Sequence, residues 1–279
     1  MKLLRVFVII SILIYTIDSC GQIVVDWNEV PKQIGTHWIK NSKDSVSVNL
    51  GVAGGPQSWN FTAQSMGDEN SYLVIVNPST CPYTDSFPAA NLVYSSPAGS
   101  DTVYQYYGLN SDYLIMLGMA GVSTTSPFLW KYNPSDSIPF PQSYGSIYRY
   151  HYGFIDEISP GNFLKYYHFG SQAYDAYGTV NIPYGSYDCL RICCYDTCAM
   201  TIYSDSIPVF YDTTTYINYQ FLTENYAAVV CIKSYPDESN PNFTEAYILE
   251  RLTSFTSGID NSDEMYVLSC FHSPQPFTN

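Results

Sequence analysis

The chain has 279 residues, of which 25 are acidic and 11 are Lys or Arg, so its formal net charge at neutral pH is −14. We expect no binding to nucleic acid, because phosphate recognition needs clustered Lys and Arg, and no such cluster is visible in the sequence. Only 13% of the residues are charged, about half of the ~25% typical of a globular domain. Tyrosine is heavily used, at 28 residues, and it favours the half-buried surfaces of β-sheets.

The first residues predict a secretory signal peptide over residues 1–21. Lys2 and Arg5 precede an apolar run over residues 6–15, and Ser19-Cys20-Gly21 follows as a cleavage site. A membrane-spanning helix needs ~20 apolar residues, so we expect no transmembrane span in the mature chain. Residues 17–20 also resemble a bacterial lipobox, which leaves lipidation at Cys20 as an alternative. The leader therefore predicts a protein that is secreted or held at the outer cell surface.

Alternation with a period of two, the pattern of β-strands, recurs along the chain, whereas helical periodicity does not. The alternating stretches and short apolar runs occupy residues 45–50, 72–76, 113–117, 148–152, 215–221 and 227–232, with Gly- and Pro-rich turn signals between them. We predict an all-β domain over residues 22–255, built as a strongly curved antiparallel sheet (a half-barrel) or as a β-sandwich, with few helices. Residues 256–279 indicate a linker followed by the start of a truncated further domain.

The aromatic residues offer the clearest candidate for a binding surface. Tyrosine and tryptophan give flat, amphipathic contact area that suits sugars and protein partners. We predict a binding patch on neighbouring strands, formed by Tyr104, Tyr106, Tyr148, Tyr150 and Tyr152. Packing within the sheet is the alternative role for each of these side chains. The four tryptophans, Trp27, Trp38, Trp59 and Trp130, are predicted to be core residues.

Four cysteines fall within ten residues, at Cys189, Cys193, Cys194 and Cys198. Their spacing lacks the paired C-x2-C pattern of a zinc site, so we predict disulfide bonds among them and no bound metal. On an extended strand Cys189 and Cys193 share one face and Cys194 lies on the other. A tight turn over residues 195–197 would instead bring Cys194 opposite Cys198. The connectivity stays open at this stage.

No catalytic residue and no cofactor are predicted from the sequence. The histidines stand in no recognisable nucleophile motif, and no Gly-rich phosphate loop precedes a helix. The adjacent acids Asp156 and Glu157 would point to opposite faces of a strand. We expect an exported or cell-surface structural or binding protein without catalytic activity, whose partner is a glycan, a lipid or an envelope protein. The alternative is a secreted hydrolase, directed at glycans or esters, that carries no readable motif.

Three sequence blocks resemble a family of uncharacterised secreted bacterial proteins. The blocks are residues 55–61 (GPQSWNF), residues 138–145 (IPFPQSYG) and residues 177–192, which contain YGTV followed by IPYGSYDCLRI. Members of this family commonly end in a type IX secretion sorting domain, and residues 258–260 and 268–278 resemble the start of one. The usual PNP motif is replaced by SPQP at residues 273–276, and the rest of the domain is missing. The resemblance implies a curved sheet of the half-barrel kind and transfers no activity.

Overall fold

The computed structural model describes residues 22–98, 101–123 and 126–258, and every structural statement below concerns these residues. They form fifteen strands and two short 3-10 helices, with no α-helix. The elements are β1 (Val24–Val25), β2 (His37–Ser47), β3 (Gly54–Asn60), β4 (Asn70–Val76), η1 (Pro78–Thr80), η2 (Thr84–Ser86), β5 (Leu92–Ala98), β6 (Asp101–Leu109), β7 (Tyr113–Val122), β8 (Phe128–Pro139), β9 (Gln142–Ser143), β10 (Ile147–Ser159), β11 (Asn162–Ile182), β12 (Gly185–Ser204), β13 (Ile207–Thr223), β14 (Ala227–Lys233) and β15 (Glu245–Thr256). The prediction of an all-β fold is confirmed.

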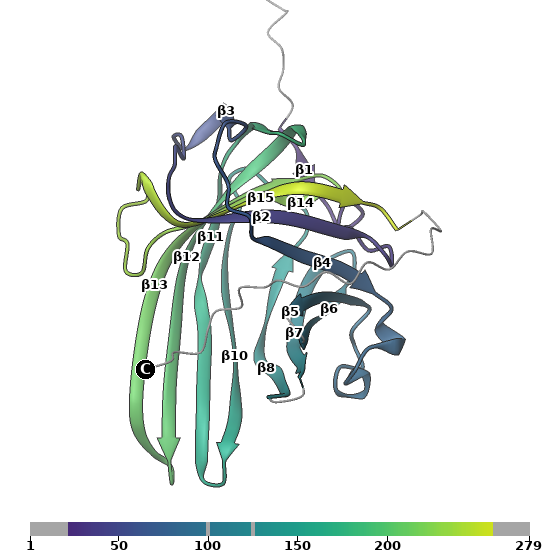
Figure 1. The fold of residues 1–279 in the computed structure, drawn as a ribbon, viewed down its shortest axis with the longest axis vertical. Helices are drawn as coiled ribbons and strands as arrows, with labels where there is room; N and C mark the ends of the chain where they lie inside the picture. The colour runs from purple at the N-terminus through teal and green to yellow at the C-terminus, as the bar shows by residue number, and fades with distance from the viewer. Residues whose placement is uncertain (1–21, 99–100, 124–125, 259–279) are drawn as a thin grey trace, which may run out of the picture.

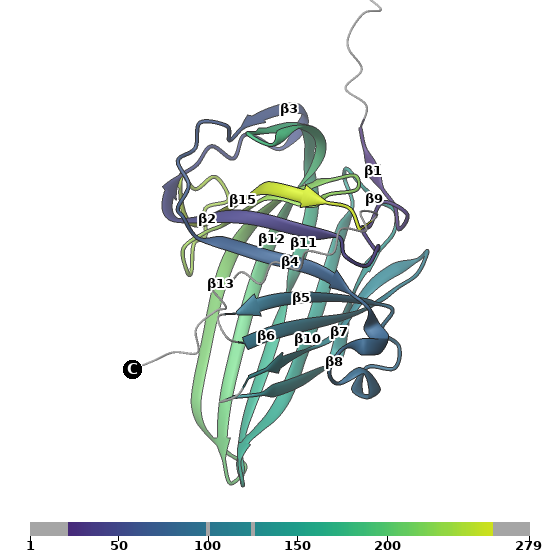
Figure 2. The same ribbon diagram turned by 45° about the vertical axis from the view of Figure 1, so that its right-hand side comes forward.

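One large sheet contains all the strands except β1 and β9, which pair with each other. The strand order of its main path is β10-β11-β12-β13-β14-β15-β2-β4-β5-β6-β7-β8, and every pairing along this path is antiparallel. β3 lies off the path and pairs with β11 in parallel. The long strands β10–β13 form one wall of the molecule, and β4–β8 curl round to face them (Figures 1 and 2).

The two ends of this curl, β8 and β10, meet through side chains, and no ladder joins them in the described part of the chain. The ring of Trp130 stacks on that of Phe154 with centroids 4.4 Å apart, and Trp130 Nε1 donates to Asp156 Oδ2 at 3.1 Å. The sheet therefore remains open and strongly curved, as the half-barrel prediction requires.

In the C-terminal halves of β11 and β13, every second residue is buried, as the alternation in the sequence predicts. In β11, every second residue from Tyr174 to Ile182 is buried, and β13 shows the same pattern at Ile217, Tyr219 and Phe221. These residues, apart from Tyr174 and Gly178, belong with Trp38 to the largest core cluster. Two further clusters flank it, one around Tyr174 and Leu190 and the other around Phe87 and Tyr106. Alternation of this kind fixes the register, because a slip by one residue would turn the apolar set outward.

The tryptophans divide into two groups. Trp38 and Trp59 are each only 3% exposed and lie in the main core, as predicted. Trp27 and Trp130 are half-buried, which corrects the prediction that all four are core residues. Trp27 carries the ammonium group of Lys32 over its ring at 3.9 Å, and Trp130 closes the seam between β8 and β10.

Of the two alternatives for residues 195–197, the structure shows the extended strand and not the tight turn. β12 runs unbroken from Gly185 to Ser204 and is paired on both sides, with Tyr195 opposite Ser171 of β11 and Ile217 of β13. Tyr195 and Thr197 are good strand formers, and their pairing on both sides outweighs the single turn-favouring residue Asp196 between them.

The cysteine predictions are corrected in the same region. All four cysteines of the cluster lie along β12, and the structure holds no disulfide bond among the residues it describes. Cys189 and Cys193 pack in one cluster and Cys194 in another, so the two faces expected of an extended strand are observed. Burial raises the pKa of the thiols of Cys193, Cys194 and Cys198.

Several predictions concern parts of the chain that lie outside the described residues. These are the signal peptide over residues 1–21, the lipidation site at Cys20 and the start of a sorting domain after residue 258. Within the described residues, no helix has the length and the apolar character needed to cross a membrane.

Candidate functional site

The structure separates the five tyrosines that the sequence proposed as one patch. Tyr148, Tyr150 and Tyr152 occupy alternate positions of β10 and therefore share one face of the sheet. Tyr104 and Tyr106 lie on β6, which is separated from β10 by β7 and β8 and contributes to a different core cluster.

Tyr106 has a structural role, which corrects its assignment as a binding residue. Its side chain is fully buried and stacks on Phe87 with ring centroids 4.2 Å apart. Its hydroxyl donates to the backbone carbonyl of Pro82, in the segment that carries the two 3-10 helices. A phenol that is enclosed and hydrogen-bonded in this way has no surface left for a ligand. Tyr104 packs half-buried against the same cluster.

Tyr150 and Tyr152 join residues that the sequence analysis did not select. The ring of Tyr152 lies 4.9 Å from that of Tyr132 on β8, and the Tyr152 hydroxyl is hydrogen-bonded to Nδ1 of His168 on β11. Tyr150 meets the same imidazole edge-on, with centroids 5.5 Å apart. Tyr166, two residues before His168, faces the same way because side chains alternate along a strand. We call Tyr132, Tyr150, Tyr152 and Tyr166 the inner tyrosines.

The inner tyrosines lie on the concave side of the sheet. The phenol of Tyr152 on β10 is close enough to Tyr107 on β6, as well as to Tyr132 and Tyr166, for their charges to raise its pKa further. β6 and β10 are not neighbours in the ladder, so this proximity arises across the inside of the curl. All of these side chains are half-buried.

A polar chain crosses four adjacent strands beside the inner tyrosines. It runs from Tyr152 on β10 to His168 on β11, then to Asp196 on β12 and Asn218 on β13. His168 Nε2 lies 3.5 Å from Asp196 Oδ1, and the other carboxylate oxygen accepts a hydrogen bond from Asn218 Nδ2. We call these four residues the inner polar chain.

One atom of the inner polar chain has unused hydrogen-bonding capacity. His168 Nε2 is buried and makes no hydrogen bond within the described part of the protein, although it lies near Asp196. Most buried polar atoms in native proteins do find a partner. If the Tyr152 phenol donates to Nδ1, the imidazole proton resides on Nε2. The site therefore offers a donor and a carboxylate acceptor side by side.

Burial controls the charges of this face. It lowers the pKa of His168 to about 4, with a further contribution from Lys233, and it raises the pKa of Asp196 to about 6 despite the opposing effects of Asn218 and Lys233. Burial likewise raises the pKa of the phenols of Tyr132 and Tyr166. At neutral pH the imidazole and the phenols are therefore uncharged, and the carboxylate is the main anion of the inner polar chain.

The environment of the inner polar chain does not activate Cys198 as a nucleophile. Cys198 lies directly opposite His168 in the β11–β12 register and accepts a hydrogen bond from the Tyr166 hydroxyl at 3.4 Å. Burial raises the pKa of the Cys198 thiol, whereas nucleophilic cysteines need a lowered pKa because the thiolate is the reactive form. Across the described ranges, no group of three or more His, Cys, Asp or Glu side chains could hold a metal ion.

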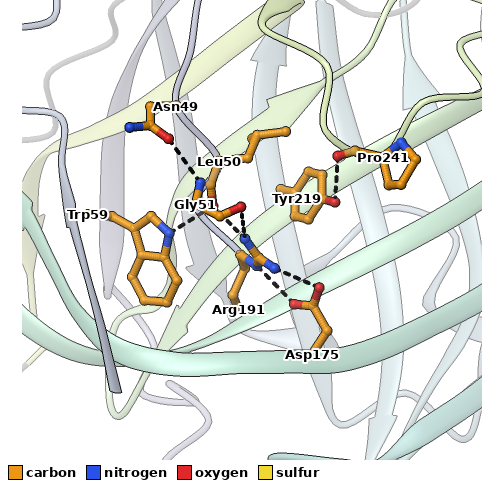
Figure 3. A network of polar contacts seen from close by, with 8 residues as sticks. All are labelled: Asn49, Leu50, Gly51, Trp59, Asp175, Arg191, Tyr219 and Pro241. Atoms are coloured by element: carbon orange, nitrogen blue, oxygen red, sulfur yellow. Dashed lines mark hydrogen bonds and ion pairs between the residues drawn. The ribbon is translucent and has the colours of Figure 1, made fainter. Parts of the chain in front are cut away.

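A second polar network surrounds Arg191 of β12, which the sequence analysis did not single out (Figure 3). Arg191 forms a two-pronged ion pair with Asp175, with N–O distances of 2.9 and 2.7 Å. Its Nη1 also donates to the backbone carbonyls of Leu50 and Gly51. The guanidinium is 2% exposed and all three of its nitrogens are hydrogen-bonded, so it holds the backbone together and has no donor group without a partner.

No family model matches the chain, and no curated protein matches it. A solved structure, the crystal structure of a putative lipoprotein from Parabacteroides distasonis ATCC 8503, aligns with 84% of this chain and 100% of its own, at 12% identity and a TM-score of 0.39.

Proposed function

We propose that this is an exported, cell-surface binding protein that takes an uncharged, hydroxyl-rich ligand, a glycan, on its concave face. The amino-terminal leader and the resemblance to secreted proteins with a sorting domain support export. The observation that carries the ligand assignment is the grouping of the half-buried inner tyrosines on the concave face, beside the His168 imidazole and the Asp196 carboxylate.

The chemistry of this face favours a glycan over the other partners considered. Phenol rings can stack on the faces of sugar rings, and an imidazole donor beside a carboxylate suits neighbouring hydroxyl groups. A lipid chain would cover the ionised Asp196 carboxylate and would leave His168 Nε2 without a hydrogen-bond partner, which is costly. A protein partner needs a flat exposed patch, whereas the inner tyrosines are half-buried on a concave surface.

Binding to a panel of neutral oligosaccharides tests the proposal. In Tyr132→Ala and Tyr152→Ala, loss of ring contact should weaken the best oligosaccharide by about tenfold each, which corresponds to ~1.4 kcal/mol. Tyr211→Ala is the matched control. Tyr211 is 68% exposed and lies on the opposite face of β13 from Asn218 of the inner polar chain. Equal affinities in all three variants, or no oligosaccharide binding by the wild type, would refute the proposal.

A further inference from the structure

A second hollow lies away from the concave face, between the end of β2 and the segment of β3. Its volume is about 510 Å³, within the range of small-molecule sites. Ten residues line it, over residues 47–51 and 57–64, and none of them is charged. We call this hollow the loop pocket. Its elements are distinct from those that carry the inner tyrosines.

Two buried arginines hold the walls of the loop pocket. Arg191 Nη1 donates to the carbonyls of Leu50 and Gly51 on one wall, as Figure 3 shows. Arg251 Nη1 donates to the carbonyls of Phe61 and Gln64 on the other, the latter at 3.1 Å.

Trp59 connects the two walls, because its Nε1 donates to the Leu50 carbonyl at 2.8 Å (Figure 3). The strand that carries Trp59 is fixed in turn by its parallel ladder to β11. The pocket is therefore pre-formed by the core, which spares a ligand the entropy of ordering loops.

Carboxamide groups supply the polar surface of the pocket. The side chains of Gln57 and Gln64 are half-buried in its lining. Asn49 uses its Oδ1 to accept from the Gly51 amide at 3.1 Å, and Asn60 uses its Oδ1 to accept from Thr62. The amide NH2 groups of both asparagines are left for other partners. Because a carboxamide has two donors and an acceptor, such a set can bind several hydroxyl groups at once.

The lining restricts the chemical class of the occupant. No lining residue could form a direct ion pair with an ionised ligand, because Arg191 and Arg251 lie behind the walls and donate to wall carbonyls. A purely apolar ligand would bury the carboxamides without partners. Val48, Trp59 and Phe61 form the floor of the pocket but are nearly buried in the core, so the surface open to a ligand is mainly polar. We propose that the loop pocket is a second binding site, which takes one neutral saccharide unit independently of the concave face.

Side-chain amide resonances of the whole protein give a direct test. Glucose, galactose, mannose and N-acetylglucosamine are titrated separately, and the NH2 signals of Gln57 and Gln64 are followed by NMR. We expect saturable shifts with at least one sugar, with a Kd of about 1 mM, as befits a single small ligand. The double variant Gln57→Ala/Gln64→Ala should weaken this binding about tenfold, followed at the NH2 signals of Asn49 and Asn60 because both glutamine side chains are absent. Gln33→Ala, at an exposed position outside the pocket, should leave it unchanged.

Further measurements distinguish this inference from the proposed function at the concave face. Tyr132→Ala should retain the shifts at Gln57 and Gln64, whether or not it alters oligosaccharide binding at the concave face. The inference is overturned if no sugar shifts these signals, if the double variant binds as the wild type does, or if Tyr132→Ala abolishes the shifts. Tighter binding of the neutral amide N-acetylglycinamide than of any sugar would overturn the saccharide class. Thermal unfolding of the double variant within about 2 °C of the wild type shows that any loss is local.

Discussion

Two polar networks on the same pair of strands differ in how completely their atoms are paired. The network of Arg191 and Asp175 is closed, because each guanidinium nitrogen has a partner at a carboxylate or a carbonyl. The inner polar chain of His168 and Asp196 is held loosely at 3.5 Å, with Nε2 of the imidazole unpaired within the described residues. Paired groups stabilise a fold, whereas buried groups with unused capacity are a feature of sites that bind. The first network therefore has a structural role, and we assign the second a role in binding.

The largest effect is expected at the closed network. Arg191→Met should lower the free energy of unfolding by about 4 kcal/mol, because it leaves the Asp175 carboxylate and two carbonyls without their partner. Urea denaturation followed by tryptophan fluorescence measures this change. Lys165→Met, which removes a half-buried cation of β11 from outside the network, should cost less than about 1 kcal/mol. Similar losses in both variants would remove the contrast on which the structural role of Arg191 rests.

A smaller, pH-dependent effect is expected at Asp196. Its folded pKa, about 6, is above the ordinary value of 3.8, so the folded state holds its proton more tightly and stability falls as pH rises from about 4 to 6. Asp196→Asn removes this loss of stability. The difference in free energy of unfolding between the variant and the wild type should therefore shift in favour of the variant from pH 4 to pH 7, by up to about 3 kcal/mol.

The contribution of His168 to stability depends on pH in the opposite sense. In the wild type the two contributions offset each other, so the pH profile of the wild type alone does not show either one. His168 has a folded pKa of about 4, below the ordinary 6.5, and it therefore contributes stability that increases as pH rises between these values. In Asp196→Asn this increase should become visible in urea denaturation between pH 4 and 6.5. If the free energy of unfolding changed with pH in the same way in the variant and the wild type, this would contradict the pKa shift assigned to Asp196.

The smallest effect on stability is expected for Tyr152→Phe. The change removes one hydroxyl and its hydrogen bond to His168 Nδ1 but keeps the ring against Tyr132, so it should cost about 1 kcal/mol. Without that hydrogen bond the imidazole is no longer held in one tautomer, so the ligand should bind less tightly even though the fold is intact. Calorimetric titration with the best oligosaccharide measures the affinity. An unchanged affinity would show that the Tyr152 hydroxyl has no role in ligand binding.

Local pattern predicted the strands well, because period-two alternation directly reflects which face is buried. It left a strand and a turn open at residues 195–197, since pairing with both neighbouring strands decides that segment and no local pattern reveals it. Tyr106 and Tyr152 illustrate the same limit, because Tyr106 meets Phe87 in the tertiary fold and Tyr152 meets His168 through the register of β10 and β11. Asp196 and His168 are brought together by the register of β11 and β12, which the sequence does not specify by itself.

Two of the sequence blocks meet in the fold, which the sequence analysis did not predict. Residues 55–61 and 177–192 are far apart in the chain, yet β3 pairs with β11 in parallel, with Trp59 opposite Val180. The second block also contains Arg191, which supports one wall of the loop pocket. These two segments therefore form a structural junction, although neither carries a catalytic motif.

The most direct test of the account is a paired measurement of stability and binding for His168→Asn. If the inner polar chain exists for a ligand, the variant should unfold within about 1 kcal/mol of the wild type at pH 7 and bind the best neutral oligosaccharide at least about tenfold more weakly. A variant that loses several kcal/mol of stability while the folded fraction keeps its full affinity would show that His168 supports the fold, and would contradict the account.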